Sequence, residues 1–275
     1  MKTVLITGCS TGIGRALSIS LCRHGFNVWA TARNPESIAD LKQSGIKTAV
    51  LDVTDSQQVD ALVDNILATD GRIDMLINNA GYGAMGAIAE TPIAEIERQF
   101  TTNTFAPVYL IQRVIPSMRK QGSGTLINIG SVSGILTSPF SGIYCASKAA
   151  LHTLSEALRI ELAPFGIDVI TVQPGAIQSS FGKTATRELE NILPENSLYQ
   201  SIEETLRRRA GASQERPTTA EAFSEKLVSI LLRKKKPAII RIGRGSFVMP
   251  FIRQWLPQPL LQRLLSRLFN LNKVS

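Results

Sequence analysis

A tyrosine and a lysine stand four positions apart in the stretch SGIYCASKAA, residues 141–150. On a helix, side chains with this spacing project from one face, so Tyr144 and Lys148 can meet there. A cation beside a phenol favours the phenolate, and the spacing therefore predicts that Lys148 lowers the pKa of Tyr144 from its usual value of about 10. Tyr144 is thus a candidate acid–base residue. The alternative is a pair of solvated residues on a surface helix.

The elements that position this pair alternate regularly along the chain. Short, almost continuously apolar runs predict strands at residues 3–7, 27–32, 47–52, 74–79, 124–130, 168–173 and 238–242. Amphipathic stretches predict helices at residues 12–24, 55–69, 93–120, 143–163 and 218–232. Continuous apolar strands are typical of a parallel sheet that is covered on both faces, so we expect one doubly wound α/β domain of about seven strands. The long polar interval 176–216 follows the sixth strand, where such folds build ligand sites.

Glycines follow the first predicted strand in the segment TGCSTGIGRAL, where the chain turns into a helix. Gly8, Gly12 and Gly14 permit a tight turn and a close approach of the backbone to a pyrophosphate. The N–H groups at the start of the helix then bind the phosphates. The spacing G-x-x-x-G-x-G differs from the common G-x-G-x-x-G, and turns use glycine in any case. The position between a strand and a helix nevertheless favours dinucleotide binding.

The residue after the second predicted strand indicates which dinucleotide binds. Folds that bind NAD place an acidic residue about 20 positions after the glycines, where it accepts a hydrogen bond from the ribose 2′-OH. The corresponding segment ATARN has no acidic residue but contains Arg33. A guanidinium suits the 2′-phosphate of NADP, and the hydroxyl of Thr11 in the glycine loop is a second donor. We therefore expect NADP(H) in preference to NAD(H); a solvated arginine is the alternative.

Taken together, these motifs resemble the short-chain dehydrogenase/reductase family over about residues 1–180. The further matching positions, in the family's order, are Thr7, Asp52-Val53, Asn78-Asn79-Ala80-Gly81, Asn103, Ser131, Pro174-Gly175, Ile177 and Ser179. The family usually has threonine at the position of Ser179, which is a mild difference. The resemblance implies a Rossmann-type fold and an enzyme that transfers a hydride between a nicotinamide cofactor and a carbonyl or alcohol.

The resemblance also implies a role for each site residue. Tyr144 is the general acid that protonates the carbonyl oxygen, or the base in the oxidative direction, and Lys148 lowers its pKa and binds the nicotinamide ribose. Ser131 hydrogen-bonds the substrate oxygen, and Asn103 holds a water that links Lys148 to solvent. Besides Tyr144 and Lys148, the implied cofactor-binding residues are Gly8, Ser10, Thr11, Gly12, Ile13, Gly14, Arg33, Asp52, Val53, Asn79, Ala80, Gly81, Pro174, Gly175, Ile177 and Ser179.

Cysteine and histidine usage gives no sign of a metal site. The three cysteines and two histidines have no metal-ligand spacing, so we expect no metal and a reduced cytoplasmic protein. The first residues lack the pattern of a secretion signal, and no apolar stretch has membrane-spanning length. We interpret Cys9 and Cys145 as small buried side chains. His152 is interpreted as a packing or interface residue, because Tyr–Lys chemistry needs no imidazole.

Charged residues are distributed unevenly along the chain. Residues 1–204 contain 15 Lys/Arg and 19 Asp/Glu, whereas residues 205–275 contain 15 and 3. At the end of this basic part, one stripe of a predicted helix consists of Leu260, Leu261, Leu264, Leu265 and Leu268, and the opposite stripe of Gln262, Arg263, Ser266 and Arg267. A basic amphipathic helix with nearby aromatic residues is typical of a membrane interface. The alternative is that the leucines cap the substrate site or pack on a partner subunit. No recognition module for nucleic acid accompanies the charge.

The sequence therefore predicts a catalytic domain, residues 1–245, with a substrate loop at 176–216 and a basic amphipathic extension at 246–275. The extension resembles the branch of 17β-hydroxysteroid and retinol dehydrogenases and acyl-dihydroxyacetone phosphate reductases. We expect an NADPH-dependent carbonyl reductase or alcohol dehydrogenase for a hydrophobic, steroid-, retinoid- or lipid-like substrate. An NAD-linked alcohol dehydrogenase and a non-catalytic nucleotide-binding or membrane-associated scaffold are the alternatives. The family implies a homodimer or homotetramer, and residues 247–275 imply peripheral membrane contact.

Overall fold

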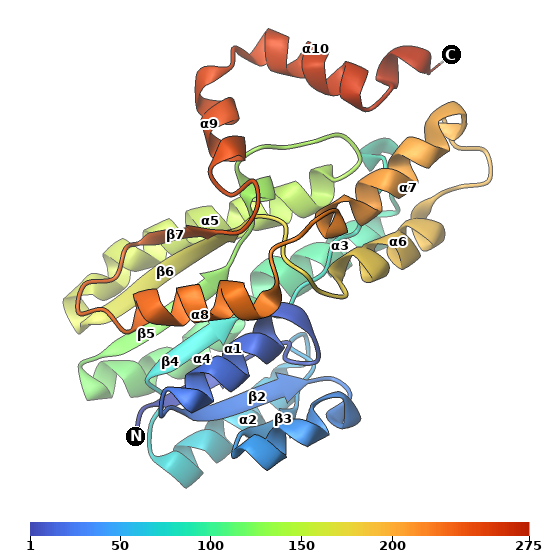
Figure 1. Cartoon of the computed structure of the whole chain (residues 1–275). Coiled ribbons are helices and arrows are strands. Elements are labelled where there is room, and N and C mark those ends of the chain that lie inside the picture. The colour runs from blue at the N-terminus through green and yellow to red at the C-terminus, as the bar shows by residue number, and fades with distance from the viewer. Residues whose placement is uncertain (275) are drawn as a thin grey trace.

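Seven parallel strands form a single sheet in the computed structural model, which describes residues 1–274 (Figure 1). The strands lie in the order β3-β2-β1-β4-β5-β6-β7. Their bounds are β1 Thr3–Ile6, β2 Asn27–Ala32, β3 Lys47–Val50, β4 Met75–Asn78, β5 Gly124–Ile129, β6 Ile167–Pro174 and β7 Ile239–Ile242. Every predicted strand is present and pairs in parallel, which confirms the doubly wound α/β fold.

Helices cover both faces of this sheet (Figure 1). One face carries α1 (Gly12–Arg23) and α8 (Ala220–Leu231), and the other carries α2 (Ser56–Asp70), α4 (Ala106–Gln121) and α5 (Gly142–Leu162). In β1, Val4 and Ile6 are buried in the core on the first side and Leu5 in the core on the second. Successive strand residues point to opposite faces, so a sheet covered on both sides needs apolar residues at every position.

Two predicted segments have a different local structure. The single helix expected over residues 93–120 is divided into α3 (Ile93–Phe100) and α4 by a π-helical turn, η3 (Thr101–Phe105). Such turns insert one extra residue into a helix and often mark functional sites. The interval 176–216 contains two helices, α6 (Phe181–Ile192) and α7 (Glu203–Gly211). The remaining short helices are η1 Pro35–Ser44, η2 Ile88–Glu90, η4 Val132–Gly134, η5 Ala163–Phe165, η6 Gln200–Ile202, η7 Ala212–Gln214 and η8 Leu271–Lys273.

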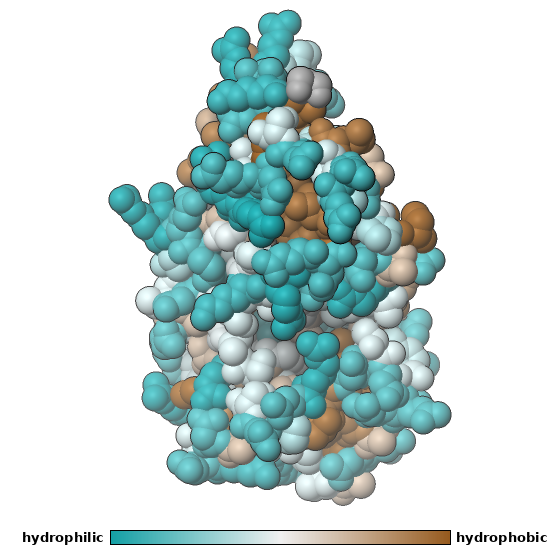
Figure 2. Space-filling view, turned by 90° about the vertical axis from the view of Figure 1, so that its right-hand side faces the viewer, coloured by the Kyte–Doolittle hydropathy of each residue, from teal (hydrophilic) through white to brown (hydrophobic). Residues whose placement is uncertain are grey.

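Beyond β7 the chain forms α9 (Val248–Trp255) and α10 (Gln258–Leu268), which lie at the upper end of Figure 1. Leu261 of α10 is buried, and Phe269 and Leu271 pack against the apolar cluster that contains Tyr144. Apolar surface lies among hydrophilic residues toward this end of the molecule (Figure 2). No helix within residues 1–274 is both long and apolar enough to cross a membrane.

A chain of buried polar side chains links the central strands to α5. Asn78 Nδ2 at the end of β4 donates to Asn128 Oδ1 in β5 (2.9 Å), and Asn128 Nδ2 donates to Ser155 Oγ in α5 (2.8 Å). Ser155 Oγ donates in turn to the Leu151 carbonyl (2.6 Å). Buried amides need partners, so these bonds fix the position of α5 over the carboxyl end of β5.

Candidate active site

The predicted site residues gather at the carboxyl edge of the sheet, around the point where the strand order reverses between β1 and β4. The glycine loop, residues 8–14, follows β1, and residues 79–81 follow β4, so the two loops face each other across this point. Doubly wound folds bind ligands at such crossover points. The other predicted positions follow neighbouring strands at the same edge: Arg33 after β2, Asp52 and Val53 after β3, Ser131 after β5, and Gly175, Ile177 and Ser179 after β6, which ends at Pro174.

Close contacts explain why two positions of the loop are glycine. Gly8 has a φ of +71°, and a Cβ there would lie 2.8 Å from the Ala80 Cα. A Cβ on Gly14 would collide with the Gly8 carbonyl and the Asn79 side chain. Asn79 Nδ2 donates to the carbonyls of Thr7 (2.8 Å) and Gly8 (2.9 Å), which ties the loop after β4 to the glycine loop. The glycines are therefore required by the packing of one loop on the other.

The start of α1 fits the phosphates of a dinucleotide. Its N-cap residue Thr11 makes no side-chain capping bond, and no acidic residue lies in the first turn, so the first N–H groups keep their partial positive charge for an anion. Arg33 is exposed and has no carboxylate partner among the described residues. The hydroxyl of Thr11 was expected to serve the 2′-phosphate as well, but it pairs with Ser180 Oγ at 2.7 Å. These residues fit a nicotinamide dinucleotide, and Arg33 is an exposed cation at the same edge of the sheet.

The Tyr–Lys pair lies on the first turns of α5, and both side chains are buried. Burial raises the pKa of Tyr144 to about 12, against the opposing effects of a hydrogen bond from Ser131 and the charge of Arg209. Burial lowers the pKa of Lys148 to about 8. The prediction that Lys148 lowers the pKa of Tyr144 is wrong for this structure, because the ammonium donates to the Ile129 carbonyl (2.8 Å) and loss of hydration dominates at the phenol.

Two hydrogen bonds fix the position of Ser131. Its Oγ accepts from the Ser133 N–H (3.1 Å), so Ser133 has a turn role at the start of η4. The Ser131 N–H donates to Nε2 of His152 (3.3 Å). The His152 ring fills the space beside Gly130 and Gly134, where a Cβ on either glycine would strike the imidazole. The interpretation of His152 as a packing residue thus omitted a hydrogen bond to the backbone of Ser131.

Asn103 lies in the π-helical turn η3, fully buried. Its Nδ2 donates to the Tyr82 carbonyl (2.9 Å) and to Ser147 Oγ (3.1 Å), and its Oδ1 accepts from the Tyr82 N–H (3.2 Å). A Cβ on Gly81 would lie 2.9 Å from this Oδ1 and 3.5 Å from Lys148 Nζ, so the two groups border the same glycine. Both amide hydrogens are used within the protein, which leaves one lone pair on Oδ1 for the predicted water.

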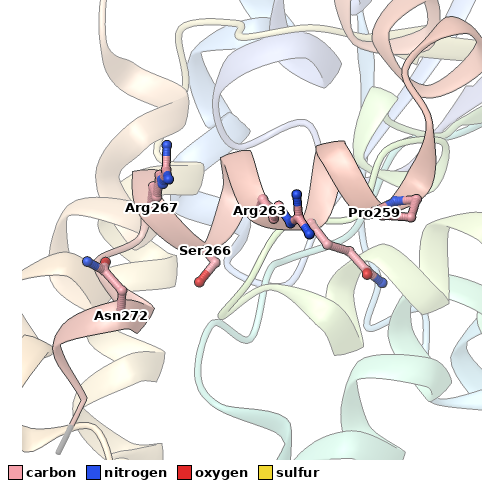
Figure 3. Close-up of a pocket in the computed structure, with 6 residues that line it drawn as sticks. Pro259, Arg263, Ser266, Arg267 and Asn272 are labelled. Carbon is pink, nitrogen blue, oxygen red and sulfur yellow. The ribbon is translucent and has the colours of Figure 1, made fainter.

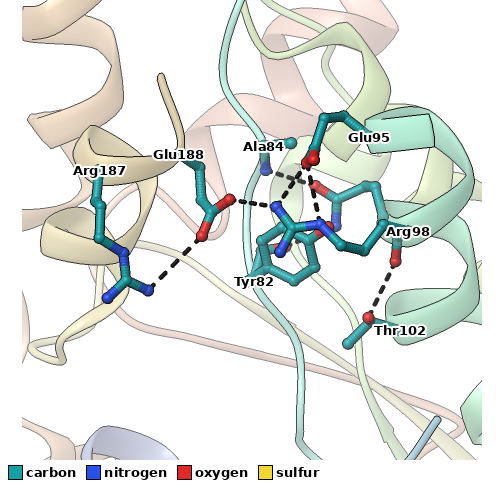
Figure 4. Close-up of polar contacts among 8 residues, drawn as sticks. Tyr82, Ala84, Glu95, Arg98, Thr102, Arg187 and Glu188 are labelled. Carbon is teal, nitrogen blue, oxygen red and sulfur yellow. Dashed lines mark hydrogen bonds and ion pairs between the residues drawn. The ribbon is translucent and has the colours of Figure 1, made fainter. Parts of the chain in front are cut away.

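An ion-pair cluster beside the site was not predicted (Figure 4). Arg98 of α3 pairs with Glu95 one turn earlier and with the buried Glu188 of α6. Its guanidinium also lies over the ring of Tyr82, 4.8 Å from the centroid. The cluster joins α6 to the segment that holds Asn103. The spacing of Glu95 and Arg98 could have indicated their pair, but nothing in the sequence relates either residue to Glu188, because that contact exists only after folding.

Apolar side chains surround the phenol of Tyr144. The ring of Phe181, the first residue of α6, lies 5.3 Å from the Tyr144 ring. Phe140 stacks edge-on with Tyr199 at 5.2 Å and with Phe269 at 6.3 Å. The other members of this cluster are Met85, Ala87, Ala185, Leu189, Leu193, Ile202, Leu206, Ala210, Leu271 and Val274. Most come from the substrate interval 176–216 and from the C-terminal residues, so these segments form the environment of the phenol.

The doubly wound sheet with a glycine loop at its crossover point defines a dinucleotide-binding α/β fold. The chain matches the short chain dehydrogenase family over residues 2–190. It is 32% identical over 253 residues, 92% of both proteins, to a probable short-chain type dehydrogenase/reductase, VdlC, of Helicobacter pylori. It is 34% identical over 263 residues, 95% of both proteins, to a 3-ketodihydrosphingosine reductase of Bacteroides thetaiotaomicron. A crystal structure of a short-chain dehydrogenase from Streptomyces avermitilis is similar with a TM-score of 0.81 and 33% identity, over 100% of this chain and 97% of that one. The chain therefore belongs to the short-chain dehydrogenase/reductase family and is an oxidoreductase.

The neutral imidazole of His152 leads to a prediction about pH. Burial, with smaller effects of the Lys148 and Arg241 charges, lowers the pKa of His152 from 6.5 to about 4. Between these values the unfolded chain binds a proton that the folded chain does not, so stability rises with pH. When the pH falls from 6.5 to 4, we expect the free energy of unfolding to fall by about 1–3 kcal/mol more in the wild type than in His152→Gln.

Urea unfolding at a series of pH values measures this difference. Glutamine keeps an oxygen acceptor for the Ser131 N–H but does not titrate, and the carboxylates that both proteins share cancel in the comparison. Parallel stability curves for the two proteins would contradict a neutral, buried His152.

Proposed function

We propose that the protein is an NADP(H)-dependent reductase of apolar ketones or aldehydes, able to oxidise the corresponding alcohols in reverse. The observation that carries the proposal is the environment of Tyr144, which combines the hydroxyl of Ser131 with a cluster of apolar side chains. A substrate that presents its carbonyl to the phenol meets this apolar surface, and apolar contact area favours its binding. The relative from Bacteroides, named for reduction of a keto lipid, supports this substrate class.

The side chains of the site supply proton transfer and orientation, while a bound nicotinamide would supply the hydride. Because the pKa of Tyr144 is about 12, the phenol is protonated at neutral pH and can donate to a carbonyl oxygen. The hydroxyl of Ser131 binds the same oxygen and fixes its position. Lys148, with a pKa of about 8, is mostly cationic at neutral pH, while the hydrogen bond of Ser131 and the charge of Arg209 favour the phenolate that remains. Asn103 keeps one lone pair for a water near Lys148. This water would return a proton to Tyr144.

We propose NADP(H) rather than NAD(H) because of Arg33. It is exposed directly after β2, the position at which NAD-binding folds have an acidic residue. The glycine loop and the N–H groups at the start of α1 would hold the phosphates, Asp52 and Val53 would adjoin the adenine, and Lys148 would bind the nicotinamide ribose. The carboxylate of Asp52 also accepts two hydrogen bonds from Thr54, at 2.9 and 2.7 Å, which fixes its orientation.

We further propose that residues 246–275, beyond the catalytic domain of residues 1–245, contact an anionic membrane surface. Three aromatic residues are exposed here: the N-cap residue Phe247 of α9 (65%), and Phe251 (63%) and Trp255 (68%) within α9. In α10, Leu260, Leu264 and Leu268 form a stripe of exposed leucines. Helix geometry places Arg263 and Arg267 beside the leucine stripe, and both border a shallow hollow on the polar side of α10 (Figure 3).

Charge favours a membrane over a second copy of the chain as the partner of this surface. Residues 226–275 contain 11 Lys/Arg and no Asp/Glu. Two such segments facing each other would repel, whereas anionic lipid attracts them. A peripheral position would also bring the apolar environment of Tyr144 close to lipid-soluble carbonyl compounds, since Phe269 and Leu271 belong to the same C-terminal segment. The homodimer or homotetramer expected from the family stays a prediction.

Tyr144→Phe tests the reaction. The variant removes the donated proton, and we expect kcat for NADPH-dependent reduction to fall about 100-fold or more while NADPH binding changes little. The assay is NADPH oxidation with steroid ketones, retinal and long-chain aldehydes. Tyr109→Phe, a tyrosine on α4 outside the site, should keep wild-type activity. If the wild type bound NADPH but reduced no carbonyl compound, the non-catalytic alternative would be favoured.

Arg33→Ala tests the cofactor. Loss of the charged hydrogen bonds to a 2′-phosphate should weaken NADPH binding by about 10- to 100-fold and leave NADH binding nearly unchanged. Fluorescence titration of both cofactors measures this. Arg23→Ala, an exposed arginine at the end of α1, is the matched control. Equal losses for the two cofactors would contradict the choice of NADP(H).

Trp255 reports membrane contact directly. Of the two tryptophans, Trp29 is buried and donates to Asp70 (2.6 Å), so a change in emission on adding vesicles comes from Trp255. We expect a blue shift with phosphatidylglycerol vesicles and none with phosphatidylcholine. Leu264→Ser combined with Leu268→Ser should weaken vesicle binding about 10-fold or more. Leu232→Ser is the control at an exposed leucine after α8; unchanged affinity of the double variant would remove α10 from the contact.

A further inference from the structure

Arg209 lies near Tyr144 and has no acidic partner within the described residues 1–274. It belongs to α7, close to Leu206, which is buried in the apolar cluster around the phenol. Its Nε donates to Ser138 Oγ (2.9 Å) and its Nη2 donates to Ser141 Oγ (2.9 Å). Both acceptors are neutral hydroxyls in the segment that leads into α5. The cation is therefore oriented by the protein but not neutralised by it.

Two other arginines in this region are paired with carboxylates. Arg207, two residues earlier and more exposed, pairs with Glu203 at 2.7 Å, and Arg98 pairs with the buried Glu188. Within residues 1–274, no carboxylate lies within ion-pair distance of Arg209. A partly buried cation without a counter-ion costs free energy, and proteins usually place an acidic residue beside it. Of the three arginines of α7, Arg209 is thus the least exposed and has no anion within residues 1–274, whereas Arg208, also unpaired, is exposed to solvent.

The guanidinium keeps donors for a ligand. Of its five N–H groups, two donate to the serines, and the two on Nη1 and one on Nη2 have no acceptor within residues 1–274. Nη1 of Arg209, which has no partner, is not among the fully buried unpartnered polar atoms, so its two donors reach accessible space. Burial lowers the pKa of Arg209, while Cys145 and Tyr144 oppose this shift, which places the cation within electrostatic reach of the phenol. The free N–H groups of the planar guanidinium match the spacing of two oxygens of a carboxylate or phosphate.

We infer that Arg209 binds an oxyanion of the substrate, a carboxylate or phosphate group carried near the carbonyl that Tyr144 protonates. The inference rests on the proposed function, because it assigns the substrate class of the same site. The substrate then combines an apolar chain, which contacts the cluster around the phenol, with an anionic group that reaches the guanidinium. A role limited to anchoring α7 would need only a neutral donor to the two serines, and it predicts no preference among ligands.

Binding to the NADP⁺-loaded full-length protein tests the inference without relying on turnover. The probes are hexyl phosphate, hexanoate and hexan-1-ol, measured by calorimetry. One charge-assisted contact should make an anionic probe bind about 10- to 100-fold more tightly than the alcohol. Arg209→Met keeps the apolar part of the side chain and should abolish this preference. Arg208→Met, at the exposed neighbour on α7, should retain it, and comparison of the phosphate with the carboxylate identifies the anion.

Measurements of turnover provide a second test. With ketones of equal chain length, one neutral and one carrying the preferred anion, Arg209→Met should lower kcat/KM for the anionic ketone by about 10- to 100-fold and leave the neutral ketone within a few-fold. Ser138→Ala removes one anchoring hydroxyl but keeps the guanidinium, so the preference for the anionic ketone should persist.

Three results would overturn the inference: no preference for anions in the wild type, the same loss in Arg208→Met, or an equal loss for neutral and anionic ketones in Arg209→Met. The last result would show that Arg209 acts on Tyr144 or on the fold. Absence of any carbonyl reduction by the wild type would instead refute the proposed function, and the calorimetric comparison would still decide whether Arg209 binds an oxyanion.

Discussion

Hydrogen bonds from one face of α5 to the end of β5 determine the geometry of the site. Lys148, His152 and Ser155 each bind a different residue of the segment 128–131, at 2.8, 3.3 and 2.8 Å. Their spacing places them on the face that also carries Tyr144. Because the strand end and the helix are joined at three points, the phenol is held relative to the residues that follow β5. A shift of α5 along the sheet would break all three bonds in a buried environment, where lost partners are costly.

The neighbouring elements depend on the same contact. Asn78 joins β4 to β5 through its bond to Asn128, so the loop of residues 79–81 keeps its place beside the glycine loop. From the other side, Asn103 binds Ser147, the residue before Lys148 in α5. The π-helical turn makes this bond compatible with the continuous path of α3 and α4, because it changes the direction of one side chain without ending the helix. The residues proposed for proton transfer and those proposed for dinucleotide binding therefore share one buried polar framework.

Local patterns predicted the strands and the main helices, because these depend on burial period, whereas most site residues were indicated only by the family resemblance. The division of 93–120 could not be predicted, since a π-helical turn leaves the apolar periodicity almost unchanged. The helices α6 and α7 were read as a polar loop, because half of each is solvated and Ala185, Leu189 and Leu206 are too few for a clear pattern. The raised pKa of Tyr144 was missed for another reason: spacing gives the neighbour of a group on a helix, but not how strongly the rest of the fold excludes water from it.

The residues proposed for the chemistry and those proposed for substrate choice lie in different parts of the chain. The residues proposed to act on a carbonyl oxygen or to adjoin the dinucleotide lie before about residue 180, and the family match ends at residue 190. The apolar side chains around Tyr144, together with Arg209, come largely from residues 181–274. Membership of the family therefore establishes the type of reaction, whereas we propose that the substrate is selected by segments that lie mostly beyond the family match of residues 2–190. Since these segments contact the phenol through packing and charge rather than through the sheet, they can change without disturbing the bonds that hold α5 on β5.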